Sequence, residues 1–401
     1  MSASNSSLPP IPFSRPTIEE EEIAEVVDTL RSGWITSGPK VRQFEEMFKQ
    51  RLGVPHALAF TSATAGLHVL LIALGIGPGD EVIVPTMTWA STANMVELVG
   101  ARAVLADVDP LTLQIDPLAV QRLISPRTKA VIPVHYAGEP SDLDAIKQLI
   151  AGRNIFLIED AAHALGTAYK GKEIGSDSLA AIFSFHPIKN ITTGEGGVIV
   201  CHDSDLAKRL SLLRFHGIDR DAWKRYATNA GPQYDVVEPG YKYNLTDIQA
   251  ALGIHQLAKL DRFNVRREYL AEQYNLLLKD IPGVVPLGRV SYPAKHAWHL
   301  YIVRFDAEES GISRDRVIQM MAQENISLGL HFHPLHLQAY YQSKYNYRPE
   351  DLPHASKAGA EIVSLPLYPL LSEAEQVRIV DTLSKVLDHL RASENHLSIA
   401  V

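Results

Sequence analysis

The stretch Phe183-Ser-Phe-His-Pro-Ile-Lys-Asn-Ile-Thr-Thr-Gly-Glu-Gly-Gly197 decides the fold of this chain. It ends an apolar run, places the hydroxyl of Ser184 five residues before Lys189, and leads through a glycine cluster into the apolar run Val198–Val200. Both apolar runs are predicted to be strands of a buried sheet, with the lysine at its edge. Because an unpaired ammonium is expensive to bury, Lys189 is either paired or chemically used. The plain alternative is a surface lysine in a glycine-rich loop.

The residues around this stretch predict a wound α/β sheet. From Leu58 to Val200, short apolar segments alternate with helical ones, which is the rhythm of strands connected by helices. Their near-continuous apolarity is typical of strands buried on both faces. The candidate strands are Ala57–Phe60, Glu81–Pro85, Ala103–Asp107, Ala130–His135, Ile155–Glu159, Ala181–Phe185 and Gly197–Cys201.

The remaining sequence predicts a leader and a second, smaller domain. The start of the chain is rich in Ser and Pro, and Thr17-Ile-Glu-Glu20 is a capping box that should open a helix. After Thr246 the pattern changes to longer helices, a strand at Leu300–Phe305 and a helix opening at Ser372. We therefore predict a flexible leader over 1–13, a large domain over 14–246 and a small α+β C-terminal domain over 247–401.

Composition excludes several classes of function. The chain has 401 residues, 46% hydrophobic and 21% charged, as in a folded globular protein. The net charge of -8, without a basic cluster, argues against nucleic acid as a partner. The single cysteine, Cys201, excludes an internal disulfide framework. No signal peptide and no membrane-length apolar run is found, so we expect a cytoplasmic protein that does not enter a membrane.

Three other segments offer groups that a cofactor site needs. Thr61-Ser-Ala-Thr-Ala65 lies between a strand and a helix, where free amides form an anion cradle. Asp160 follows a buried strand, at the edge where open α/β sheets bind ligands, and His163 comes three residues later. Pro85-Thr-Met-Thr-Trp89 offers an aromatic face. Taken singly, these segments have plain interpretations: an N-cap, a packed histidine and a core tryptophan.

Taken together, these groups are what a fold-type I pyridoxal phosphate enzyme requires: a phosphate cradle, a stacking aromatic, an acid, a hydroxyl and a lysine, each at a strand end. We predict that Lys189 forms a Schiff base with pyridoxal 5'-phosphate and that Ser184 lies near the phosphate. Asp160 would keep the pyridine nitrogen protonated, and His163 would touch the phenolic oxygen. No metal site is expected, because His331, His333 and His336 share a Pro-containing segment without a cysteine partner.

From about Phe13 to Leu390 the chain resembles the DegT/DnrJ/EryC1/StrS family of sugar aminotransferases. The resemblance is carried by Gly33–Pro39, Ile158–Gly166, Ser184–Gly197 and Gly240–Asp247. Closer parallels exist with the family members that make UDP-4-amino-4-deoxy-L-arabinose. They are Pro133–Gly138, Phe215–Gly217, His296–Leu300, Gly311–Asp315 and Gly329–Phe332.

The resemblance implies a fold-type I transferase, with a mixed, mostly parallel sheet between helices in the large domain. Lys189 would be the catalytic residue. The cofactor contacts implied are Ala63, Thr64, Trp89, Asp160, His163, Ser184, Lys189, Lys242 and Asn244. The last two would reach into a neighbouring subunit's site, which implies a homodimer with shared active sites. Most members have Asn at the position of Lys242 and Arg or a similar residue at Asn244, and many carry Gln at His163. Candidate substrate contacts are Thr36, His186, His331 and His336.

The implied activity is transfer of the amino group of L-glutamate to a 4-keto nucleotide sugar, leaving 2-oxoglutarate. The arabinose-type parallels favour UDP-4-keto-pentose as acceptor, and with it a role in lipid A and lipopolysaccharide modification and in antibiotic resistance. The alternatives are another 3- or 4-keto nucleotide hexose, or a non-catalytic regulatory protein of this fold. Gly33–Gly38, Phe215–Trp223 and His331–His336 should decide which sugar binds. A dehydratase is disfavoured, because such relatives replace the Schiff-base lysine with histidine.

Overall fold

The computed structural model describes residues 8–219, 234–305 and 312–399 of the chain. Parts of three predicted segments lie outside the described residues: positions 1–7 of the leader, positions 220–223 of the segment Phe215–Trp223, and Gly311. Among the described residues, no helix combines the length and the apolarity that crossing a bilayer requires.

A seven-stranded mixed sheet forms the centre of the large domain, with strand order β1-β9-β8-β5-β4-β2-β3. All neighbouring pairs from β8 to β3 are parallel, whereas β9 runs antiparallel to both β1 and β8. The mixed, mostly parallel sheet and its seven strands are confirmed. The bounds are β1 His56–Phe60, β2 Glu81–Pro85, β3 Arg102–Ala106, β4 Thr128–Val131, β5 Phe156–Asp160, β8 Ala180–Ser184 and β9 Gly197–Cys201.

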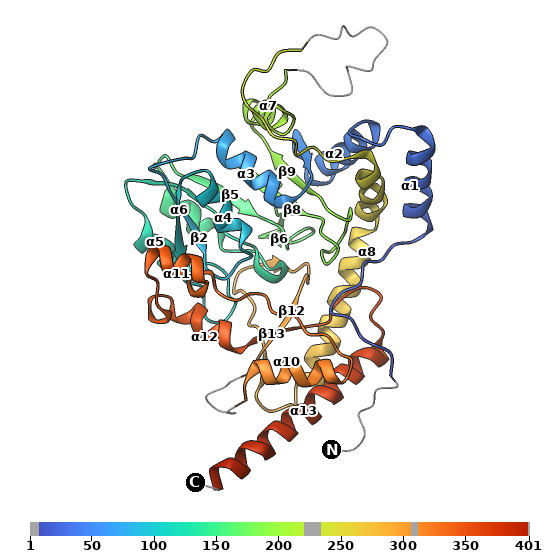
Figure 1. Cartoon of the computed structure of the whole chain (residues 1–401), viewed down its shortest axis with the longest axis vertical. Helices are drawn as coiled ribbons and strands as arrows, with labels where there is room; N and C mark the ends of the chain where they lie inside the picture. The colour runs from blue at the N-terminus through green and yellow to red at the C-terminus, as the bar shows by residue number, and fades with distance from the viewer. Residues whose placement is uncertain (1–7, 220–233, 306–311, 400–401) are drawn as a thin grey trace.

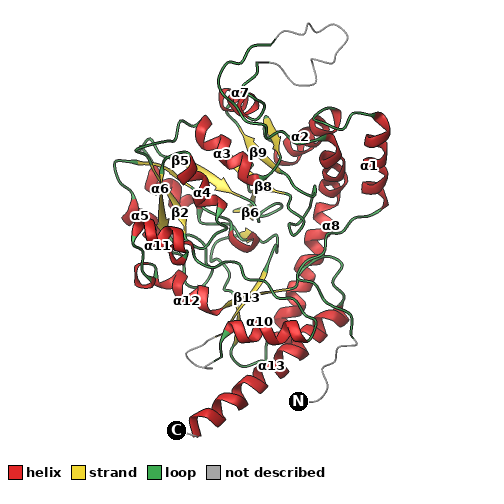
Figure 2. Cartoon of the chain, viewed as in Figure 1, coloured by secondary structure: helices red, strands yellow, loops and turns green. Residues whose placement is uncertain are grey.

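Helices cover both faces of this sheet (Figure 2). Alternate side chains of β1 show the two faces: Ala57 and Ala59 pack in one apolar cluster, Leu58 and Phe60 in another. The first cluster includes residues of α2 (Pro39–Leu52), α5 (Pro117–Leu123) and α6 (Leu143–Ile150). The second includes residues of α3 (Ala63–Ala73), α4 (Ser91–Leu98) and α7 (Ser204–Leu213). The strands are therefore buried on both sides, as their apolar sequences predict.

Helix α8 (Asp247–Leu278) connects this part of the molecule to the smaller one below it in Figure 1. Its first half packs in the core of the large sheet through Ile254 and Leu260, and its second half packs in the small core through Leu270 and Tyr274. Thr246 caps the helix with a capping box. The predicted boundary at 246/247 therefore falls at the start of a helix that belongs to both cores.

The smaller part contains the sheet β10-β12-β13 with helices α10 and α13. Ser372 precedes α13 and forms a capping box with Glu375, as predicted. A further small sheet orders β11-β6-β7. The bounds are β6 Ala168–Tyr169, β7 Lys172–Glu173, β10 Val284–Pro286, β11 Ala294–Lys295, β12 Tyr301–Phe305, β13 Ile362–Leu365, α10 Arg314–Gln323, α11 Ala339–Tyr345, α12 Pro353–Glu361 and α13 Glu373–Ile399, with 3-10 turns at Tyr136–Gly138, Leu335–Leu337 and Pro349–Asp351.

Two expectations for the N-terminal segment were wrong. Helix α1 (Glu20–Ser32) begins later than predicted, because its capping box joins Glu19 to Glu22 rather than Thr17 to Glu20. Ile11, expected in a flexible leader, is buried: its amide donates to Asn325 O at 2.8 Å, and its side chain lies in the small-domain core.

Candidate active site

A cavity of about 470 Å³ lies where the carboxyl ends of β5 and β8 face the N-terminus of α3. Most of the side chains predicted for the site line this one cavity, although they come from segments far apart in the sequence. They are Ala63, Thr64, Trp89, Asp160, His163, Ser184, His186, Lys189 and His331.

The N-terminus of α3 provides an anion cradle. Ser62 caps the helix, and its Oγ accepts the amide of Ala65 at 3.0 Å. The amides of Ala63 and Thr64 have no acceptor within the helix and lie at its positive end. Gly197 of β9 keeps the approach close: a Cβ there would lie 2.5 Å from Ala63 N. Ser184 pairs with Gly197 across the two strands, which places a hydroxyl-bearing residue beside the cradle.

Asp160 presents a buried carboxylate to the cavity from the end of β5. Thr92 Oγ1 donates to Oδ2 at 2.8 Å, and the amide of Ala162 donates to Oδ1 at 3.1 Å. Burial raises the pKa of this carboxyl above its ordinary value, and these two donors together with Lys189 offset part of the rise. The carboxylate is fixed in place but is poorly solvated, as a group that stabilises a cationic ligand should be.

Lys189 lies in the turn that follows β8, and its amide donates to His186 O at 2.8 Å. The side chain keeps some accessible surface because it lines the cavity, but protein surrounds it on its other sides. This desolvation lowers the pKa of the amine to about 8, against the opposing charge of Asp160. A lysine with such a pKa is neutral in about a tenth of molecules at pH 7, far more than an ordinary lysine, and can act as a nucleophile or a base.

His163 forms a neutral wall of the cavity. Burial lowers its pKa well below the ordinary value, and the charges of Lys189 and His331 lower it further. Its Nδ1 is buried without a hydrogen-bond partner among the described residues. The ring lies 4.3 Å from the ring of His299 and is stacked on Phe332 at 5.8 Å, measured between centroids.

The mouth of the cavity is aromatic and polar. Trp89 lines it while 63% of the residue remains exposed, which leaves a large apolar surface available to a ligand. His331 stacks on Phe13, and its Nδ1 lies 2.9 Å from Ser364 Oγ. His186 Nε2 lies 4.0 Å from Glu195 Oε1, and both residues are exposed.

Four predicted site residues do not line this cavity. Thr36 is exposed, and its carbonyl accepts the amide of Asp247. The Lys242 amine lies over the Phe215 ring at 4.1 Å. Asn244 donates to Ser37 Oγ at 2.6 Å and lines a separate depression of about 1020 Å³. The ring of His336 is buried between Thr86 Oγ1 and Ser356 Oγ.

Several residues of the cavity and its wall were not predicted from the sequence: Thr92, Glu195, His299 and Phe332. Thr92 lies inside a short helix, where a hydroxyl gives no distinctive pattern. The segments of Glu195, His299 and Phe332 had been singled out, but nothing in them indicated which side chain faces the cavity.

The residues of the cavity fit pyridoxal 5'-phosphate. The cradle that Gly197 leaves open suits a phosphate. The buried Asp160 suits a protonated ring nitrogen, and the desolvated amine of Lys189 suits an aldehyde. The unpartnered Nδ1 of His163 is a buried polar atom that the described residues leave unsatisfied.

Comparisons with known proteins agree with this geometry. Residues 16–384 match the sequence model of the DegT/DnrJ/EryC1/StrS aminotransferase family. Spr1654 from Streptococcus pneumoniae, described as a sugar aminotransferase, is 34% identical in its PLP-form, covering 95% of this chain and 99% of that chain with a TM-score of 0.86. The same protein has been solved in a PMP-form.

Two further solved structures are similar over almost their whole length. PseC from Helicobacter pylori, an aminotransferase involved in the biosynthesis of pseudoaminic acid, is 30% identical, covering 95% of this chain and 100% of that chain with a TM-score of 0.87. DesI, solved in the presence of its TDP-sugar product, is 30% identical, covering 97% of this chain and 95% of that chain with a TM-score of 0.85.

Proposed function

This chain belongs to the DegT/DnrJ/EryC1/StrS aminotransferase family, and from that premise we propose that it transfers the amino group of L-glutamate to a 4-keto nucleotide sugar. The family is PLP-dependent, with PLP- and PMP-forms among the similar structures. The observation that carries the proposal is the convergence of Lys189, Asp160 and the α3 anion cradle on one cavity.

When bound, pyridoxal 5'-phosphate supplies the carrier of the amino group and the ring that takes up the electrons of the broken bond. The amides of Ala63 and Thr64, with Ser184, would hold the phosphate. Asp160 would hold the proton on the ring nitrogen, because its carboxylate is fixed by Thr92 and has little water to solvate it. The neutral ring of His163 would orient the phenolic oxygen.

Lys189 moves protons during the transfer. Its Nζ, with a pKa of about 8, can take a proton and return it near neutral pH. Trp89 would cover one side of the bound ring and exclude water from it. The same set of residues serves both halves of a ping-pong reaction, in which glutamate leaves as 2-oxoglutarate before the keto sugar enters.

For the acceptor we propose UDP-4-keto-pentose, with UDP-4-amino-4-deoxy-L-arabinose as product. The support is the arabinose-type parallels at Pro133–Gly138, His296–Leu300 and Gly329–Phe332. This product would place the protein in lipid A modification, and hence in antibiotic resistance. The second candidate acceptor is a keto hexose on another nucleotide. DesI, which is 30% identical to this chain, was solved in the presence of its TDP-sugar product.

We also propose a cytoplasmic homodimer with shared active sites. Lys242 and Asn244 do not line the cavity of their own chain, which is compatible with a role in a neighbouring copy. Asn244 lies instead in the depression of about 1020 Å³ formed with α2 and α7, where a second copy can dock. Cys201 is free and buried, which suits a reducing compartment.

The test is an assay of the purified protein with glutamate and a panel of UDP- and TDP-linked keto sugars, with products identified by mass spectrometry. We expect amino transfer to UDP-4-keto-pentose and a visible cofactor band that changes when glutamate is added. Lys189→Ala should lose both the band and turnover. Lys170→Ala is the matched control, because that lysine pairs with Asp144 at the surface. Transamination retained by Lys189→Ala would refute the assignment, and no product from any sugar would favour a regulatory protein.

A further inference from the structure

Asn264 of α8 makes two hydrogen bonds in the wall behind the cavity. The residue is 3% exposed. Its Oδ1 accepts from Asn190 Nδ2 at 2.7 Å, and its Nδ2 donates to Leu165 O at 3.0 Å. Asn190 Nδ2 also donates to Ala297 O at 2.7 Å. Both amides are therefore committed to specific partners inside the protein.

These bonds join three segments that carry groups of the site. Asn190 directly follows Lys189. Leu165 lies in the loop between β5 and β6, which follows Asp160 and contains His163. Ala297 lies two residues before His299, whose ring contacts that of His163. The side chain of Asn264 thus connects the turn of Lys189 to the loop that follows Asp160.

The backbone around Asn264 makes room for this contact. Gly166 has a φ of +85°, and a Cβ at this position would lie 2.3 Å from Asn264 Nδ2. A residue with a side chain would be strained by the backbone conformation and would displace the amide. The loop after His163 can therefore approach α8 only because position 166 is glycine.

We propose that Asn264 is a positioning residue that holds the Lys189 amine in a fixed relation to Asp160 and His163. The inference rests on the proposed role of Lys189 in amino transfer. Without the Asn190–Asn264 bond, the turn of Lys189 loses its side-chain link to the loop that follows Asp160, and only the bond from Thr192 N to Gln256 Oε1 still joins it to α8. A reacting group displaced by about 1 Å can lose on the order of 100-fold in rate.

A purely structural role makes a different prediction. Buried amides are generally hydrogen-bonded, and removing one destabilises a protein wherever it lies. Gln376 provides the control, because it is a buried amide that donates to O of Leu270, a residue of the small-domain core, at 2.8 Å. Asn264→Leu and Gln376→Leu should both lower stability, the second by less because Gln376 Oε1 has no partner among the described residues, and only the first should alter Lys189.

The first measurement uses cofactor-free protein. Competitive acetylation of Lys189, followed by mass spectrometry as a function of pH, reports the protonation of its amine. The parent should titrate near 8. The titratable groups that face the amine are Asp160 at the end of β5, His163 in the next loop, His299, and His331 in the segment before the 3-10 turn Leu335–Leu337, and they are unchanged in the variant. In Asn264→Leu we expect the midpoint to rise toward that of an ordinary lysine, because the loosened turn lets water reach the amine.

The second measurement uses the complete enzyme. Asn264→Leu should reduce kcat on the order of 100-fold with little change in KM, and Gln376→Leu should keep the parent's kcat. If Asn264→Leu does not fold, Asn264→Ser, which keeps a small polar side chain, should change both readouts in the same direction. Identical Lys189 titrations and kcat values in the Asn264 and Gln376 variants would overturn the inference. The acetylation readout needs no turnover, so it separates failure of this inference from failure of the proposed function.

Discussion

In the cavity, burial and charge pairing act in opposite directions on the pKa values of Asp160 and Lys189. Burial raises the pKa of Asp160 and lowers that of Lys189, and each charge only partly offsets the effect on the other. The two groups are thus held in an environment that does not favour their ionised forms. A ligand that brings a cationic ring nitrogen to Asp160 relieves the free-energy cost of ionising this buried carboxyl. This relief contributes to the binding free energy of the ligand.

Asp160→Asn should therefore stabilise the cofactor-free protein while it removes activity. The pKa of Asp160 in the folded protein lies above 3.8, its ordinary value. The protonated carboxyl is therefore the form that the fold favours. Its contribution to stability is fully present below pH 3.8 and is lost as pH rises through the folded pKa. At neutral pH the neutral amide avoids this loss, and the melting temperature should rise. Activity should fall by roughly 100-fold or more, the scale of removing one preorganised electrostatic group. Thermal unfolding and steady-state kinetics check the two halves. A less stable, fully active variant would contradict the account.

The sequence predicted the residues of the cavity that lie at strand ends. Asp160 and Ser184 end buried strands, and Ala63 and Lys189 come shortly after one, so strand pattern and residue chemistry together located them. The contacts of Asn264 could not be predicted, because the sequence in the middle of a long helix does not indicate which loop will pack against it. His336 was predicted as a substrate contact together with His331, but its ring is buried between Thr86 and Ser356 and does not line the cavity.

At the scale of elements, the contact of β9 with the start of α3 shapes the anion cradle. Gly197→Ala would place a Cβ 2.5 Å from Ala63 N and 2.7 Å from Ser62 C, both backbone atoms that must shift. We expect a loss of about 1–3 kcal/mol in the free energy of unfolding, as for overpacked cores. Affinity for pyridoxal phosphate should also fall, because the cradle amides move. Denaturant titration and cofactor-binding fluorescence measure the two effects.

Gly77→Ala is the control for this substitution. It lies in a turn where the nearest heavy atom to an added Cβ is Val99 O at 3.7 Å, which is an ordinary contact. Its stability and cofactor affinity should stay near those of the parent. Equal cofactor affinity in the two alanine variants would show that the cradle does not depend on the close approach of β9.

Elements were predictable where burial imposed a long pattern. The seven strands of the main sheet are apolar on both faces, and their sequences show it. Strand β4 ends at Val131 rather than at His135, since Pro133 has no amide to donate. The strands β6, β7 and β11 are two residues each, too short to leave a periodicity. The antiparallel direction of β9 is set by tertiary pairing, which no local pattern encodes.

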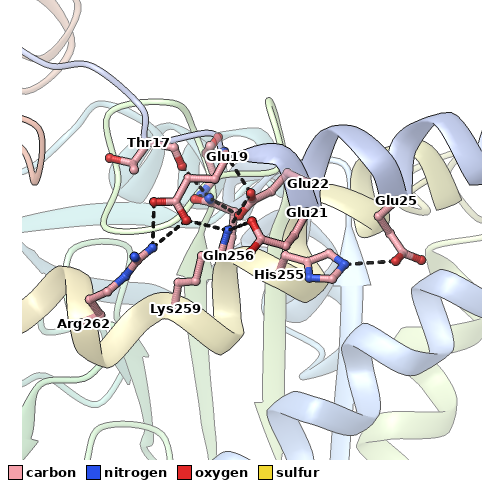
Figure 3. A network of polar contacts seen from close by, with 10 residues as sticks. Thr17, Glu19, Glu21, Glu22, Glu25, His255, Gln256, Lys259 and Arg262 are labelled. Carbon is pink, nitrogen blue, oxygen red and sulfur yellow. Dashed lines mark hydrogen bonds and ion pairs between the residues drawn. The ribbon is translucent and has the colours of Figure 1, made fainter.

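At the scale of the whole molecule, α8 ties the two cores and the N-terminal segment together. Figure 3 shows polar side chains of α8 meeting the start of α1: Gln256 donates to Thr17 O and Glu22, and Lys259 contacts Glu19, Glu21 and Glu22 at 2.8–3.0 Å. Gln256 also accepts the amide of Thr192, three residues after Lys189. Among the described residues, this glutamate group has the geometry to hold a metal ion, but the Lys259 ammonium already contacts all three carboxylates, and Arg262 also pairs with Glu19.

Lys259→Gln should release this junction. Burial alone would raise the pKa of Glu22, but bonds from Lys259 and Gln256 lower it on balance. Its stabilising contribution is therefore present above 4.5 and is lost as pH falls through the folded pKa. We expect a loss of roughly 2 kcal/mol at neutral pH, because a buried carboxylate loses its charged partner, and a smaller loss in acid. Lys208→Gln, which breaks an exposed pair with Asp205, should change stability much less, because water screens an exposed ion pair. Urea denaturation of both variants across pH measures these losses in the free energy of unfolding. Similar losses in the two variants would mean that the junction contributes no more than a surface ion pair. A loss for Lys259→Gln that does not become smaller in acid would mean the same.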